Sequence, residues 1–109
     1  MSPSNDTLER LESTLEARRN ADADSSYVAS LFARGEDAIL QKVGEEATEF
    51  LLASKSGDAV HLVKEAADVW FHMLVLMKHK GLGLTDILEE LERREGLSGL
   101  DEKASRTAD

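Results

Sequence analysis

Cysteine is absent from this chain, and proline occurs once, at Pro3. Without thiols the protein cannot use a cysteine nucleophile, bind an iron–sulfur cluster on its own or fold around disulfides. Aromatic residues make up only 5% of the sequence. These absences exclude a disulfide-stapled secreted scaffold, and the lack of proline after Pro3 favours uninterrupted helices.

Long apolar runs are also missing. The most apolar stretch, residues 69–77, holds eight apolar residues and His72, whereas a membrane-spanning helix needs roughly 18 to 20 apolar residues. The N-terminus shows no basic region followed by an apolar run, so we expect no signal peptide, no membrane partner and a cytoplasmic protein.

Positive charge is scarce as well. The 13 basic residues are outnumbered by 22 acidic ones, which gives a net charge of −9. Nucleic-acid binding depends on Lys and Arg side chains that displace counterions from the phosphate backbone. We therefore expect no nucleic-acid partner, and a polyanionic small substrate would need a bridging cation.

Strong helix formers fill the chain between short breaks marked by Gly and Ser, which predicts an all-α helical bundle in a single domain, residues 1–109. We expect five helices, at about residues 7–19, 26–34, 36–56, 58–80 and 85–95. The two long helices follow each other directly and predict a central antiparallel hairpin. The polar tail, residues 97–109, is expected to be partly disordered.

The segment 69–77 is apolar around its whole circumference and needs cover on every side. It is either a central core helix or a helix–helix interface between subunits. A chain of 109 residues has few helices to supply that cover. We therefore favour the interface and expect a homodimer or a higher homo-oligomer.

One glutamate of the third helix falls on its buried face. At 100° per residue, Glu46 lies about 20° from the centre of the apolar stripe, with Lys42, Glu49 and Glu45 progressively further to one side. The stripe itself consists of Ile39, Val43, Phe50 and Ala53. Burying an unpartnered carboxylate costs several kcal/mol, so Glu46 should be protonated, paired with a cation or bound to a metal.

On the fourth helix, Glu65 and Asp68 edge the buried stripe and share one longitudinal row with His61 and His72. A neutral histidine beside carboxylates is more often a hydrogen-bond partner than a metal ligand. We interpret both histidines in that way.

Antiparallel packing of the two helices, about 8–10 Å apart, would bring Glu46 and Glu49 together with Glu65 and Asp68. Four like charges at such distances repel strongly, and unless several are protonated they require a divalent cation. Oxygen ligands alone select a hard ion, so we expect Mg²⁺, with Mn²⁺ as the alternative. The plain alternative is a solvated acidic helix face without a ligand.

Two motifs carry a resemblance to a known superfamily. EEATE at residues 45–49, followed after fifteen residues by EAAD at 65–68, resembles the EExxE…ExxD signature of the all-α, MazG-like nucleotide pyrophosphohydrolases. The segments SYVASL (26–31), QKVGEE (41–46) and GLDEKASR (99–106) are similar to the phosphoribosyl-ATP pyrophosphohydrolases of histidine biosynthesis. The resemblance covers residues 8–106.

This resemblance implies Mg²⁺-dependent hydrolysis of phosphoribosyl-ATP to phosphoribosyl-AMP and pyrophosphate, the second step of histidine biosynthesis. The Mg²⁺ ligands that it implies are Glu46, Glu49, Glu65 and Asp68. Glu45 would orient or deprotonate the attacking water, and Lys42 would contact a substrate phosphate or pair with Glu46. The other candidate substrate-binding residues are Arg34, Lys103 and Arg106.

Three other functions stay open at this point. A house-cleaning nucleoside triphosphate pyrophosphatase of the same superfamily would act on noncanonical triphosphates. A non-catalytic helical interaction module would dock a partner on its apolar helix and leave the carboxylates solvated. A di-iron carboxylate bundle is disfavoured, because the sequence lacks the Glu-x-x-His motifs of such sites.

Overall fold

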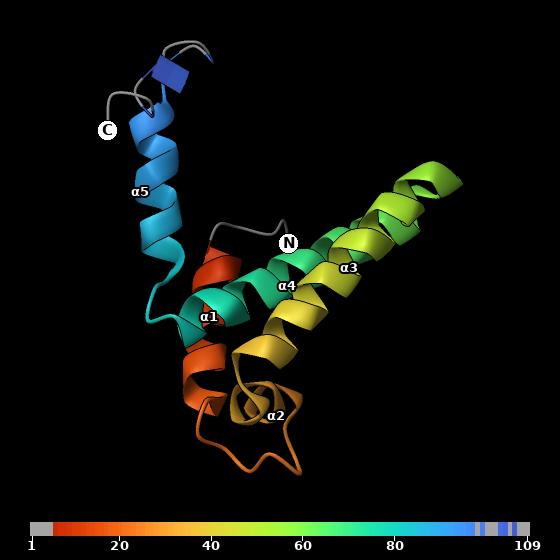
Figure 1. Cartoon of the computed structure of the whole chain (residues 1–109), viewed down its shortest axis with the longest axis vertical. Helices are drawn as coiled ribbons and strands as arrows, with labels where there is room; N and C mark the ends of the chain where they lie inside the picture. Colours follow the sequence, from red (N-terminus) through yellow and green to blue (C-terminus); the bar gives the residue numbers. More distant parts are fainter. Residues whose placement is uncertain (1–5, 98, 100–102, 105, 107–109) are drawn as a thin grey trace.

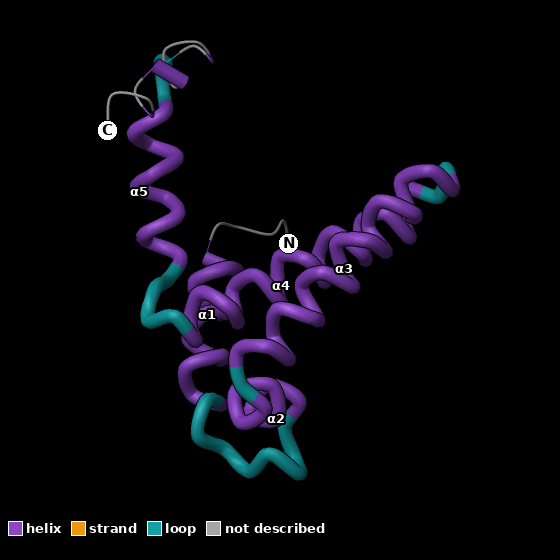
Figure 2. The backbone as a smooth tube through the Cα atoms, in the orientation of Figure 1, coloured by secondary structure: helices purple, strands orange, loops and turns teal. Residues whose placement is uncertain are grey.

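The structure is a computed structural model that describes residues 6–97, 99, 103, 104 and 106, and over these residues it contains five α-helices and no β-strand (Figure 2). The all-α prediction is confirmed. The helices are α1 (Asp6–Arg18), α2 (Tyr27–Arg34), α3 (Glu36–Ser56), α4 (Ala59–His79) and α5 (Leu84–Arg94). The predicted helix ends fall within one residue of these bounds. The expected disorder of the tail 97–109 concerns residues that lie largely outside the described ones.

A two-residue turn folds α4 back against α3. Gly57 ends α3 with a φ of 78°, a left-handed conformation that glycine adopts without steric cost. Asp58 then caps α4, because its carboxylate accepts hydrogen bonds from the amides of Val60 (3.0 Å) and His61 (3.2 Å). The predicted central antiparallel hairpin is therefore present, and Figure 1 shows it extending away from α1 and α2.

The core lies at the base of this hairpin, where α1 and α2 pack against the start of α3 and the end of α4. Its four fully buried large side chains come one from each of these helices and are Leu15, Leu31, Ile39 and Val75. Towards the turn at Gly57, the hairpin has few buried residues. This is the part that carries the acidic motifs.

The segment 69–77 is only partly covered within the described chain. His72, Leu74 and Val75 are buried, whereas Trp70 on another side of α4 is 58% exposed. No helix among the described residues is both long and apolar enough to cross a membrane.

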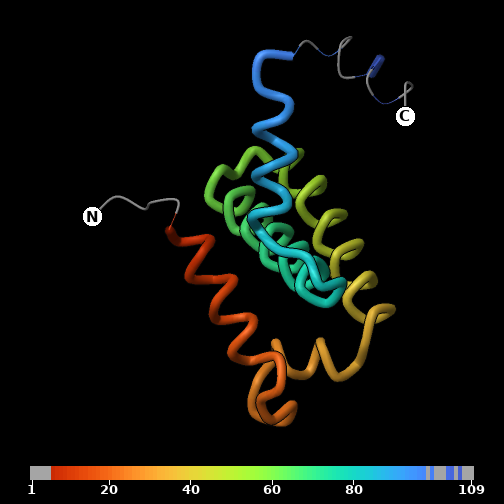
Figure 3. The backbone as a smooth tube through the Cα atoms, turned by 90° about the vertical axis from the view of Figure 1, so that its left-hand side faces the viewer, coloured from red at the N-terminus to blue at the C-terminus, as the bar shows by residue number. Residues whose placement is uncertain are grey.

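Helix α5 is attached to the core at its first residue. A side-chain oxygen of Glu12 on α1 accepts a hydrogen bond from the amide of Leu84 (2.5 Å), and the Leu84 side chain is buried. From this anchor, α5 runs in the direction away from α2, as Figures 1 and 3 show. The described residues of the tail follow its far end.

Candidate metal and nucleotide site

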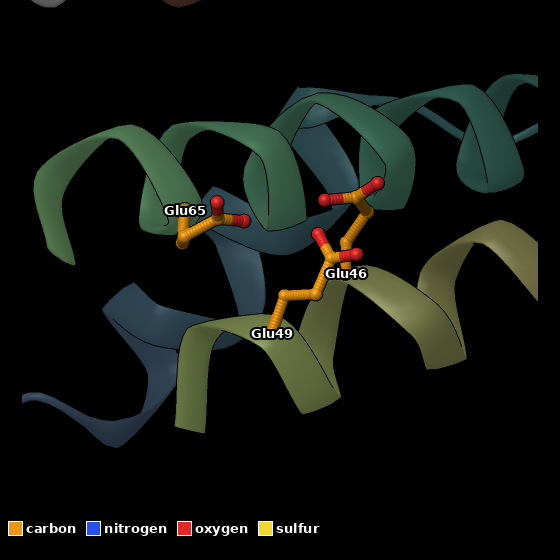
Figure 4. Close-up of side chains that lie close together, drawn as sticks. All are labelled: Glu46, Glu49 and Glu65. Atoms are coloured by element: carbon orange, nitrogen blue, oxygen red, sulfur yellow. The ribbon is translucent and has the colours of Figure 1, made fainter. Parts of the chain in front are cut away.

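Three glutamates of the hairpin point toward one another across the seam between α3 and α4 (Figure 4). One carboxylate oxygen from each of Glu46, Glu49 and Glu65 lies within 4.8 Å of the others. Glu46 is only 7% exposed, Glu65 is half-buried and Glu49 is exposed. We call these three residues the carboxylate cluster.

The turn at Gly57 sets the register that forms this cluster. Glu49 precedes Gly57 by eight residues and Glu65 follows it by eight, so an antiparallel pair of helices places them opposite each other. Glu46 reaches the seam because it lies on the buried stripe of α3, one helical turn before Glu49. The helical positions in the sequence therefore predict this convergence correctly for three of the four acids.

The carboxylate cluster is short of hydrogen-bond donors. The Oε2 atoms of Glu46 and Glu65 are buried and accept no hydrogen bond within the described part of the chain. Their Oε1 atoms have cationic or ionisable neighbours, Lys42 Nζ at 3.4 Å and His61 Nε2 at 3.3 Å respectively. A buried acceptor without a donor costs about 1–3 kcal/mol, and more when it is charged. Two orphaned oxygens beside a third carboxylate fit a hard divalent cation.

The pKa of Glu49 is raised, mainly because the negative charge of Glu46 and a hydrogen bond with Glu46 favour the protonated form, with burial and Glu65 adding to the effect. The pKa of Glu45 is lowered instead. The Gln41 amide donates a hydrogen bond to it at 2.9 Å, and Lys42 attracts its charge. Glu45 and Glu49, about one helical turn apart on α3, thus have pKa values shifted in opposite directions.

Two predicted site residues lie beside the carboxylate cluster rather than in it. The side chains of Glu45 and Asp68 are both exposed, and neither belongs to the group of carboxylates that converge within 4.8 Å. The backbone of Asp68 is held in place, because its carbonyl accepts a hydrogen bond from Nδ1 of His72 at 2.7 Å. The structure therefore brings together three of the implied ligands, and the roles of all five acids stay predictions.

The predicted substrate-binding residues are distributed over the chain. Lys42 lies between Glu45 and Glu46, and its pKa is raised: burial opposes the shift, but Tyr27 and the two glutamates outweigh it. Arg34, at the end of α2, is exposed and close enough to Glu45 to lower its pKa slightly. The exposed residues Lys103 and Arg106 follow α5 in the chain.

Both histidines of the α4 row have partners of the predicted kind. His61 contacts Glu65, and the buried His72 bridges the Asp68 carbonyl and the Tyr27 hydroxyl, which is 2.8 Å from its Nε2. Tyr27 was not singled out from the sequence, since its contact joins residues 45 positions apart. Two signals in the sequence involve it: its place in the segment SYVASL (26–31), which carries part of the family resemblance, and the Ser26 cap of α2 directly before it.

Comparisons with known proteins all indicate the same family. The sequence model of the family described as phosphoribosyl-ATP pyrophosphohydrolase matches residues 8–95. A protein of Chromobacterium violaceum named phosphoribosyl-ATP pyrophosphatase is 62% identical over 101 residues, which cover 93% of this chain and 94% of the relative. Proteins of the same name from Erythrobacter litoralis (59% identity, 92% and 96% covered) and Nitrosospira multiformis (57% identity, 94% and 85% covered) are also similar.

The matched residues include both acidic motifs and the whole hairpin. The resemblance inferred from the motifs is thereby confirmed. The chain belongs to the phosphoribosyl-ATP pyrophosphohydrolase family and is a hydrolase of that family.

Proposed function

We propose that this protein hydrolyses phosphoribosyl-ATP to phosphoribosyl-AMP and pyrophosphate in a Mg²⁺-dependent reaction, as the second step of histidine biosynthesis in the cytoplasm. The observation that carries the proposal is the carboxylate cluster with its two orphaned buried oxygens. Relatives that share more than half of the residues are named for this substrate. An acidic cluster suits a phosphate substrate because both bind the same cation.

Glu46, Glu49 and Glu65 would hold the Mg²⁺, with Asp68 as the fourth ligand. Mn²⁺ prefers the same oxygen ligands and is the alternative ion. A bound ion would supply positive charge to offset the negative charge that develops on the pyrophosphate leaving group. The pKa of Glu49 is raised because its neighbours Glu46 and Glu65 carry like charges.

Glu45 would orient or deprotonate the attacking water. Its carboxylate is exposed, and the hydrogen bond from Gln41 lowers its pKa and keeps it ionised. An ionised carboxylate accepts a hydrogen bond from the water and can take its proton as the anhydride bond between the α and β phosphates breaks. Because a lowered pKa makes a weaker base, orientation of the water is the larger part of this role.

Basic residues would bind the phosphate groups. Lys42 stays protonated next to Glu46 and can contact a phosphate at the edge of the carboxylate cluster. We assign further phosphate contacts to Arg34, Lys103 and Arg106.

The direct test is pyrophosphate release from phosphoribosyl-ATP with and without Mg²⁺. We expect release only with the metal. Faster turnover of dUTP or dCTP would instead identify a house-cleaning pyrophosphatase. Absence of heat in a calorimetric titration with Mg²⁺ would favour a non-catalytic interaction module, because that alternative leaves the carboxylates merely solvated.

A second copy of this chain is the proposed partner, in a homodimer or a higher homo-oligomer. Leu51, Val60 and Val63 on the hairpin are 64–67% exposed. Counted at 100° per residue, they lie about 140–200° around their helices from the acids of the carboxylate cluster. Since a net charge of −9 repels a second copy, this acid-free face is where two copies can meet.

Sedimentation velocity tests the assembly. We expect the wild-type chain to sediment as a dimer or larger species and Val63→Glu to shift it towards the monomer. Ala17→Glu introduces the same side chain at an exposed position of α1, outside this face, and it should leave the assembly intact. A monomeric wild-type protein would contradict the proposal.

A further inference from the structure

A chain of two hydrogen bonds links α2 to the acidic side of α4. The Tyr27 hydroxyl lies 2.8 Å from Nε2 of His72, and Nδ1 of His72 lies 2.7 Å from the backbone carbonyl of Asp68. His72 is 5% exposed, whereas the Tyr27 side chain is about half exposed. The buried imidazole therefore holds a phenol whose outer side faces solvent.

The direction of the Tyr27 hydroxyl proton follows from the acceptor at the other end. A carbonyl oxygen only accepts, so Nδ1 of His72 must carry the proton and donate it to Asp68. The unprotonated Nε2 then accepts the proton of the Tyr27 hydroxyl. The phenolic oxygen has its own proton committed, so towards solvent it can only accept a hydrogen bond. Such a group suits an N–H or O–H donor and not an ionised phosphate.

Tyr27 also lies at one end of a functional row along the hairpin. His72 follows Glu65 by seven residues, which is about 10 Å along a helix. Lys42 precedes Gly57 by fifteen residues and His72 follows it by fifteen, so their backbones lie level on the two helices, and the Lys42 side chain reaches back to pair with Glu46. The order along the hairpin is thus the carboxylate cluster, the Lys42 ammonium group and the Tyr27 oxygen that can accept a hydrogen bond. A nucleotide with its phosphates at the carboxylates would extend its sugar and base towards Tyr27.

We propose that Tyr27 binds the nucleoside part of the substrate, by accepting a hydrogen bond from a hydroxyl or amino group of that part, and that His72 is the positioning residue that directs the Tyr27 hydroxyl. The proposal rests on the proposed function for the placement of the phosphates. It adds a determinant that distinguishes a nucleotide from a bare polyphosphate.

Binding of two probes in the presence of Mg²⁺ tests this assignment. The first is α,β-methylene-ATP, which has a nucleoside and resists cleavage between its α and β phosphates, and the second is inorganic tripolyphosphate. We expect Tyr27→Phe to weaken α,β-methylene-ATP binding about three- to tenfold, the worth of one hydrogen bond, and to leave tripolyphosphate binding unchanged. Thr48→Val removes an exposed hydroxyl that donates a hydrogen bond to the Gly44 carbonyl of its own helix, and it should alter neither affinity.

Variants of His72 separate positioning from simple support of the fold. His72→Leu removes the acceptor and should reduce α,β-methylene-ATP binding as much as Tyr27→Phe, while His72→Gln keeps an acceptor and should restore part of it. The double variant Tyr27→Phe with His72→Leu should lose no more than Tyr27→Phe alone, since both act through one hydroxyl. Thermal melts verify that each variant is folded.

The proposal is wrong if Tyr27→Phe weakens both probes equally, weakens neither, or if the wild-type protein binds no α,β-methylene-ATP. A merely structural hydrogen bond would change the melting temperature without changing the ratio of the two affinities. Failure of the proposed reaction gives a different pattern, in which the probes are distinguished through Tyr27 but phosphoribosyl-ATP is not hydrolysed.

Discussion

Glu49 on α3 and Glu90 on α5 are both glutamates of solvent-facing helical stretches, yet their pKa values are shifted in opposite directions. Glu90 accepts hydrogen bonds from Arg93 (2.8 Å) and Arg94 (3.2 Å), which lower its pKa to about 2. Glu49 faces Glu46 and Glu65, and its pKa is raised. The charge of Glu90 is paired with arginines of its own helix, whereas that of Glu49 faces two further acids.

This difference shows that the number of acids does not identify a site, because both helices are rich in glutamate. What differs is the residue type three and four positions further on. After Glu90 these positions hold Arg93 and Arg94, which are standard helical ion-pair spacings. After Glu49 they hold Leu52 and Ala53, so this acid has no cation at these two spacings. A local charge pattern therefore distinguishes a structural ion pair from a candidate ligand.

The largest expected effect is on catalysis. Glu46→Gln and Asp68→Asn should each reduce pyrophosphate release from phosphoribosyl-ATP at least about 100-fold, because each removes a carboxylate that we propose as a ligand of the ion. Circular dichroism should show that both variants stay helical. Glu90→Gln removes an acid that is paired with arginines of its own helix, and this variant should keep near wild-type activity. Full activity of Glu46→Gln would show that the metal site is assigned wrongly.

Stabilisation of the fold by Mg²⁺ should likewise depend on Glu49 and not on Glu90. With Mg²⁺ at about 100 times its dissociation constant, mass action should raise the melting temperature of the wild-type protein by roughly 10 °C. Glu90→Gln should show the same rise and Glu49→Gln a much smaller one. Scanning calorimetry with and without Mg²⁺ measures this, and an equal rise in both variants would remove Glu49 from the ligand set.

Without metal, the two glutamates should have opposite effects on stability. A raised pKa means that the folded state favours protonated Glu49, so its contribution is present below the ordinary pKa of about 4.5 and is lost as the pH rises through the folded value. At pH 7, Glu49→Gln should therefore raise the melting temperature of the metal-free protein. This gain should vanish when the pH falls below about 4.5; a gain that is independent of pH would contradict repulsion as its cause.

The smallest effect is expected at Glu90. Its pKa of about 2 means that the contribution of its ion pairs is present above the ordinary value of 4.5 and is lost as the pH falls towards 2. Because the pairs are exposed, Glu90→Gln should lower the melting temperature at pH 7 by only about 1–2 °C. Melts at pH 7 and pH 3 check the sign: the difference from the wild-type protein should shrink at pH 3.

The helices and most of the carboxylate cluster could be predicted from the sequence because both depend on local rules. Glycine at helix ends and the 3.6-residue period determine where α3 and α4 begin and end and which face of each is buried. The same period placed Glu46 on the buried stripe. Asp68 lies about 60° further from the stripe of α4 than Glu65, which explains why its side chain stays exposed.

Contacts between distant segments could not be predicted in this way. The hydrogen bond between Tyr27 and His72 depends on how α2 packs against α4, and no periodicity within either helix determines that arrangement. The same holds for the Glu12 carboxylate at the start of α5. Helix propensity and spacing describe each element, whereas crossing angles depend on the packed side chains of two elements.

The two-residue turn at Gly57 also has a consequence for folding kinetics. All members of the carboxylate cluster lie within the 20 residues from Glu46 to Glu65, so the chain brings them together by closing one short loop. Short loops close early, because little chain entropy is lost. We therefore expect the repulsion among these glutamates to act on an early step of folding, before α1 packs against α2 and α4.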